Sequence, residues 1–153
     1  MPLQCDVVVD AGIDFSQSAS LSDLLRHAAM SESMTAAGRW RMTLRLSDDA
    51  TIADLHGQFF SDPTPTDVIT FPDRETSTES EMYLGDVIVS IETATNQTVE
   101  AGHSRDREVA FLALHGLLHL CGHDDVSSDQ QEQMLLRQEH LLKAWERCHG
   151  RSW

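Results

Sequence analysis

The stretch Glu108-Val-Ala-Phe-Leu-Ala-Leu-His115-Gly-Leu-Leu-His119-Leu-Cys-Gly122-His123-Asp124-Asp125 carries the strongest signals in this chain. Its first part has apolar residues on almost every side of a helical turn, which predicts a helix that is buried on nearly all sides. His115 and His119 interrupt this apolar surface. Because they are four residues apart, they lie one above the other on a single helix face. Gly122 can adopt a positive φ angle and so end the helix.

After the glycine the chain presents His123, Asp124 and Asp125 close to the same helix face. Two imidazoles at positions i and i+4, with one more donor after a tight turn, supply three ligands for a tetrahedral metal ion. The fourth position stays open for water or substrate, as in catalytic zinc sites. Two buried histidines that only make hydrogen bonds are the alternative, and the full pattern disfavours it.

Gly116 bears on the class of reaction. In the usual zinc-protease motif a glutamate directly follows the first histidine and acts as general base. Gly116 stands at that position here, which disfavours a peptidase of that type.

Composition predicts a single soluble domain over residues 1–153. The apolar content of 41% and the charged content of 24% are ordinary for a globular protein, and no apolar run reaches the length of a membrane span. The N-terminus lacks the basic region of a secretory signal, and three scattered cysteines are too few for a disulfide framework. We therefore expect a cytoplasmic protein with reduced thiols and no membrane partner.

The charge of the chain restricts its partners. A net charge of −14 argues against general binding to polyanions, because phosphate contacts need lysine or arginine, and we expect no DNA partner. Ten of the eleven basic residues are arginines, which suit bidentate phosphate contacts. Three of them alternate along a predicted strand and form either a solvated strand face or a phosphate-binding stripe: Arg39, Arg41 and Arg45.

Hydrophobic periodicity predicts strands at residues 3–9, 40–46, 68–71 and 84–91. It also predicts helices that begin near residues 20, 47, 92, 108 and 128. This order predicts an α+β fold in which a single mixed β-sheet of about four strands packs with helices, with the buried histidine helix at the centre. Residues 73–81 are polar and lack apolar anchors, so we expect a mobile loop at the rim of a cleft.

The segment 115–125 resembles the signature of the YbeY family of rRNA-maturation endoribonucleases, which is His, three residues, His, five residues, His. Pro65-Thr-Asp-Val-Ile-Thr-Phe-Pro72, Leu84-Gly-Asp-Val-Ile-Val-Ser90 and Gly102-His-Ser104 resemble further blocks of the family, in the same order. The resemblance implies a single-strand-specific, metal-dependent endoribonuclease with one Zn²⁺ ion. It also implies a role in 16S rRNA 3′-end maturation and ribosome quality control, with rRNA and the small ribosomal subunit or its proteins as partners.

This chain departs from the family pattern in two places. The third family histidine aligns with Asp125, and a carboxylate can replace an imidazole on zinc, so the expected ligands and catalytic residues are His115, His119 and Asp125. His123 is the rival third ligand. An arginine that the family usually carries is Phe60 here. The arginines that we expect to contact RNA in its place are Arg39, Arg41, Arg45 and Arg74.

Two other functions stay open at this point. The same three ligands would serve a metallopeptidase or another amide hydrolase. Alternatively, the domain would be a ribosome-assembly factor without catalysis, in which the metal is structural and the acidic surface meets basic ribosomal proteins. The missing arginine and the charge of −14 motivate this second alternative.

Overall fold

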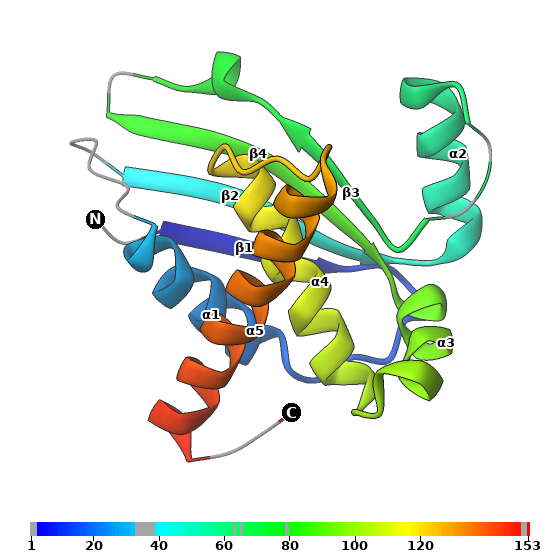
Figure 1. The fold of residues 1–153 in the computed structure, drawn as a ribbon. Coiled ribbons are helices and arrows are strands. Elements are labelled where there is room, and N and C mark those ends of the chain that lie inside the picture. Colours follow the sequence, from blue (N-terminus) through cyan, green and yellow to red (C-terminus); the bar gives the residue numbers. More distant parts are fainter. Residues whose placement is uncertain (1–2, 33–38, 63, 65, 79, 151–152) are drawn as a thin grey trace.

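The computed structural model describes residues 3–32, 39–62, 64, 66–78, 80–150 and 153. Figure 1 shows the elements, which are β1 (Leu3–Val9), α1 (Ser18–Ser31), β2 (Arg39–Ser47), α2 (Asp49–Phe60), β3 (Val68–Pro72), the 3-10 turn η1 (Arg74–Thr76), β4 (Glu81–Ser90), α3 (Ile91–Ala101), α4 (Arg105–Leu120) and α5 (Ser128–His149). The predicted α+β class and the predicted order of strands and helices are confirmed.

The strands form one mixed sheet in the order β1-β2-β4-β3. β1 and β4 both pair with β2 in parallel, and β3 pairs with β4 antiparallel. The near-continuous apolar sequence of β4 agrees with burial on both faces, because Val87 and Val89 lie in the main core and Ile88 packs with Ile52 on the other face.

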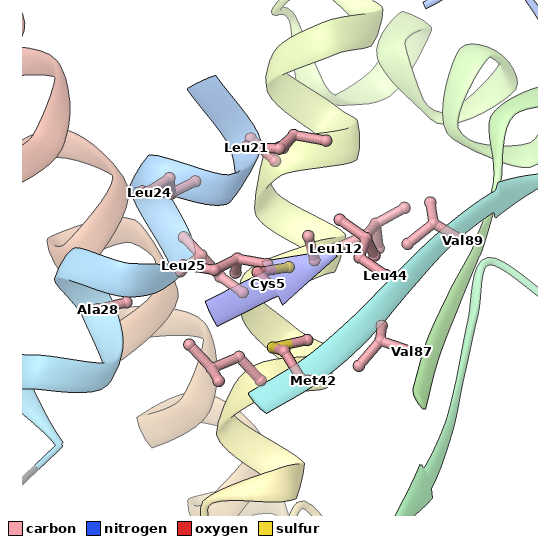
Figure 2. Close-up of a cluster of buried hydrophobic side chains, with 14 of the residues drawn as sticks. Cys5, Leu21, Leu24, Leu25, Ala28, Met42, Leu44, Val87, Val89 and Leu112 are labelled. Atoms are coloured by element: carbon pink, nitrogen blue, oxygen red, sulfur yellow. The ribbon is translucent and has the colours of Figure 1, made fainter. Parts of the chain in front are cut away.

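The main core lies between the sheet and the helices α1, α4 and α5 (Figure 1). Alternate residues of β2, from Trp40 to Leu46, are buried on this side, as the alternation of the sequence predicts. Figure 2 shows Leu25 of α1 in the same buried cluster as Cys5 of β1, Met42 of β2 and Leu112 of α4. This packing buries most of α4 between the sheet and the other helices.

A smaller apolar cluster lies on the opposite face of the sheet. Ile52 of α2 packs there with Ile69 of β3 and Ile88 of β4. The rest of this face carries polar side chains from β1 and β2, including Arg41 and Arg45. The sheet therefore has one face covered by helices and one face that is covered only in part.

The segment expected to be a mobile loop has more structure than we predicted. β4 begins at Glu81, three residues before the predicted start, and η1 lies within the polar segment. The Asp73 N–H donates to the carbonyl of Leu84, and the Tyr83 N–H donates to the Ser77 hydroxyl. The described residues of this segment are thus tied to β4 by hydrogen bonds. Within the described residues, no helix combines the length and the apolar character needed to cross a membrane.

Candidate metal centre

The last two turns of α4 bring His115 and His119 together. The side-chain hydroxyl of Ser104 accepts a hydrogen bond from Arg107 N–H and caps the start of this helix, and ten of its sixteen residues are buried. The two imidazole rings meet edge to face, with centroids 4.6 Å apart and planes at 81°. Their Nε2 atoms lie 3.0 Å from each other, as the spacing of four residues predicts.

The other ring nitrogens are both engaged. His115 Nδ1 lies 2.9 Å from Oε1 of Gln138, and His119 Nδ1 lies 3.0 Å from the backbone carbonyl of His123. The Gln138 amide is oriented because its Nε2 donates to the carbonyl of Phe111 at 3.1 Å. Both Nδ1 atoms face oxygen acceptors, so each must carry the proton. In the neutral imidazoles, two Nε2 lone pairs then point at each other, an arrangement that needs a positive charge between them.

Asp125 completes the group. Its Oδ2 lies 3.5 Å from Nε2 of both histidines. The chain returns to α4 because Gly122 adopts a φ of 101° and because the His123 N–H donates to the carbonyl of Leu118. Ligand atoms of the three side chains lie within 4.8 Å of one another. Two imidazole nitrogens and one carboxylate oxygen fit a zinc-type ion and would leave it a further coordination position.

His123 points elsewhere. Its Nε2 contacts Oε2 of Glu32 at 2.9 Å, and Oε1 of Glu32 accepts from Arg137 at the same distance. Burial acts to raise the pKa of Glu32, but the hydrogen bonds from His123 and Arg137 hold that pKa below its ordinary value. The side chain of His123 thus fastens the turn to α1 and α5, while its carbonyl orients His119.

The arginines expected to contact RNA lie in two places. Arg41 pairs with Asp6 and Glu81, and Arg45 pairs with Asp10, on the sheet face opposite α4. Arg39 is exposed at the start of the same strand. The structure therefore does not bring the Arg39, Arg41 and Arg45 stripe to the candidate metal centre.

Arg74 lies closer to the centre. Its Nη2 donates to the carbonyl of Leu120, the residue after His119, at 3.3 Å, and its guanidinium lies over the Trp40 ring. Of the four arginines, Arg74 is the one beside the end of α4. Phe60, at the position of the family arginine, packs its ring 5.9 Å from that of Phe71 and remains half exposed.

A cavity of about 190 Å³ borders His115. Asp67, Glu108 and Gln138 contribute polar side chains to its lining. The Asp67 carboxylate accepts from Gln97 at 3.1 Å, whereas Glu108 contacts the ring of His103 at 2.8 Å. The space beside the candidate metal centre is thus lined by carboxylate and amide groups as well as by apolar side chains.

Gln138 and Glu32 were not predicted from the sequence as part of the site. Gln138 is almost fully buried on the apolar face of α5, between Met134 and Leu142. A glutamine among core positions of a helix is a signal that could have identified a buried polar partner. Glu32 gives no such signal, because its role depends on how α1 meets α5.

Comparisons with known proteins relate this chain to one family. The model of the family described as endoribonuclease YbeY matches residues 10–146. An endoribonuclease YbeY from Gloeobacter violaceus is 43% identical over 115 residues, which are 72% of this chain and 59% of that protein. The relative from Halalkalibacterium halodurans is 38% identical and the alignment covers 84% of this chain and 86% of the relative.

A longer alignment and a solved structure extend the match. The endoribonuclease YbeY of Mycolicibacterium gilvum is 34% identical over 151 residues, which cover 94% of this chain and 83% of that protein. The solution structure of TM1509 from Thermotoga maritima shares the fold, with a TM-score of 0.55 and 20% identity over 94% of this chain and 93% of that one. The matched segment contains all three residues of the candidate metal centre, and the chain belongs to the endoribonuclease YbeY family.

Proposed function

We propose that this chain is a zinc-dependent endoribonuclease that cleaves single-stranded RNA during 16S rRNA 3′-end maturation and ribosome quality control. The observation that carries the proposal is the close approach of the Nε2 atoms of His115 and His119, 3.0 Å apart, with Asp125 at 3.5 Å from both. Family membership supplies the substrate class.

Each residue of the site has a separate proposed role. His115, His119 and Asp125 would hold the ion, and Gln138 and the carbonyl of His123 keep both imidazoles in the required tautomer. When bound, such an ion activates water and polarises a phosphoryl oxygen. Arg74 is our candidate to contact a phosphate, because it lies beside the end of α4. Asp67, which lines the neighbouring cavity, is our candidate to accept a proton.

The test is the substitution His119→Ala. We expect it to remove bound zinc and to reduce cleavage of a single-stranded RNA by at least about 100-fold, because a metal-activated nucleophile is lost. Zinc content by elemental analysis and cleavage by gel assay would be measured on the same preparations. His140→Ala, at an exposed position of α5, is the matched histidine control and should retain both.

Three results separate the alternatives. Unchanged RNA cleavage by the His119→Ala protein would refute the proposed mechanism. Co-sedimentation with small subunits that survives this substitution, from a protein that never cleaves RNA, would favour the assembly factor. Chelator-sensitive hydrolysis of casein would favour the amide hydrolase.

The surroundings of Gly116 speak against the amide hydrolase. A Cβ atom added at Gly116 would lie 2.8 Å from Cγ2 of Val87 and closer still to Cγ1. The helix is therefore packed too closely on β4 for the glutamate that follows the first histidine in zinc proteases.

A further inference from the structure

A second group of side chains with metal-ligand chemistry lies between α1 and α5. Asp23 and His27 are four residues apart on α1, and His149 is the last residue of α5. Figure 1 shows that the turn with Asp125 leads into the start of α5, whereas His149 is at the other end of α5. His149 is eleven residues beyond Gln138, which places it about 16 Å further along the helix.

Three ligand atoms converge in this group. Oδ2 of Asp23 lies 3.0 Å from Nε2 of His149 and 3.6 Å from Nε2 of His27. Ligand atoms of all three side chains lie within 4.8 Å of one another, as do those of His115, His119 and Asp125.

The histidine on α5 is held in the orientation of a ligand. Its Nδ1 lies 2.9 Å from the carbonyl of Trp145, an acceptor, so Nδ1 carries the proton. Its ring also stacks on the Trp145 indole, with centroids 4.0 Å apart and planes at 19°. In the neutral imidazole the Nε2 lone pair then faces the Asp23 carboxylate. An approach of 3.0 Å between two acceptors needs either a second proton on His149 or a cation beside them.

The Asp23 carboxylate is also oriented and kept ionised by its neighbours. The Trp145 indole N–H donates to Oδ2 of Asp23 at 2.9 Å, and Arg26 donates to Oδ1. Burial acts to raise the pKa of Asp23, but these two hydrogen bonds hold that pKa below its ordinary value, so the group is ionised at neutral pH. Arg26 is half exposed and occupies only one of the two oxygens.

We propose that Asp23, His27 and His149 form a second binding site, for a divalent transition-metal ion, which joins α1 to α5. Two imidazoles with one carboxylate favour Zn²⁺, Ni²⁺ or Cu²⁺ over Mg²⁺ or Ca²⁺, which prefer oxygen ligands. The thiol of Cys148 adds a soft donor nearby, since it lines the same cavity of about 190 Å³ as His27. His27 and His149 are exposed enough for an ion to enter from solvent.

The test counts bound zinc. Metal-depleted protein would be dialysed against Zn²⁺, and the ions bound per chain would be measured for wild type and for His149→Ala, His27→Ala and His140→Ala. We expect His149→Ala and His27→Ala each to bind one ion fewer than wild type, and His140→Ala to bind as many as wild type. RNA cleavage by the first two should be unchanged, because they lie far from His119.

The comparison does not depend on the proposed endoribonuclease activity, because it measures a difference in bound ions. If wild type and both variants bind equal numbers of zinc ions, the group is only an ion pair between Asp23 and a protonated histidine, and the proposal is wrong. His27 is half exposed, so the His27→Ala variant keeps the test decisive even if His149→Ala disturbs the packing on Trp145.

Discussion

Gln138 shows how one side chain on α5 orients a candidate metal ligand on α4. Its carbonyl oxygen lies 2.9 Å from Nδ1 of His115, and its amide nitrogen is fixed by the carbonyl of Phe111. We predict that Gln138→Leu weakens zinc binding by about 10–100-fold, because the tautomer and orientation of His115 are no longer set. The dissociation constant for Zn²⁺, measured by competition with a chelating dye, would show the effect.

Gln138→Glu is the matched variant, because a glutamate retains an acceptor for the His115 proton. It should bind zinc more tightly than Gln138→Leu. If Gln138→Leu and wild type bind Zn²⁺ with equal affinity, the hydrogen bond between His115 and Gln138 contributes to packing and not to metal binding.

The sequence indicated the candidate metal ligands but not the residues that orient them. The spacing of His115 and His119 predicted their shared helix face, because that spacing is local. Gln138 accepts a hydrogen bond from His115, and Glu32 accepts one from His123; these pairs are 23 and 91 positions apart in the chain. No local pattern encodes such pairs, since they depend on how α1 and α5 pack around α4.

At the scale of elements, the close contact between α4 and β4 depends on a glycine, which has no side chain, at position 116 of the helix. Gly116 faces Val87, and both are buried. We predict that Gly116→Ala destabilises the protein by about 1–3 kcal/mol, although alanine is the better helix former, because the added methyl group overlaps a rigid β-branched side chain. Urea unfolding would measure the free energy.

The partner substitution makes this prediction specific. Val87→Ala should itself be destabilising, because it leaves a cavity. The double variant should be more stable than the sum of the two losses implies, since the new methyl group then has room. Strictly additive losses would show that Gly116 and Val87 are not coupled.

Element boundaries follow the strength of the local signal. The last helix begins at Ser128, as predicted, and Ser127 and Gln130 form a capping box at its start. The start of β4 was predicted three residues late, because Glu81, Met82 and Tyr83 lie beside polar residues that resemble a loop. Their strand conformation comes from pairing with β2, which is a tertiary contact.

At the scale of the whole molecule, the alternating sequence of β2 predicted a polar face but not its partners. The parallel pairing of β1 with β2 brings Asp6 of the first strand, and Asp10 just after it, beside the arginines of the second strand. Arg45 and Asp10 make a bidentate pair, with both nitrogen–oxygen distances at 2.9 Å, and Ser47 donates to Oδ2 of Asp10 at 2.6 Å. Strand order cannot be read from one sequence, so these ion pairs were not predictable.

The same ion pairs predict how stability depends on pH. Hydrogen bonds from Arg45 hold the pKa of Asp10 below its ordinary value of about 3.9, although burial opposes them. A lowered pKa in the folded state adds stability above the unfolded pKa, and this stability is lost as pH falls through the folded pKa. Asp10→Asn should therefore be less stable than wild type by about 1–2 kcal/mol at pH 7.

The difference between Asp10→Asn and wild type should shrink as pH falls from about 5 to about 3, because wild type then loses the charge that the variant never had. Urea midpoints across this range, in salt high enough to screen the net charge of −14, would measure it. Glu100→Gln, at an exposed position of α3, is the control and should follow wild type at every pH. A constant difference between Asp10→Asn and wild type would show that the pairing of β1 with β2 does not depend on the ionised carboxylate.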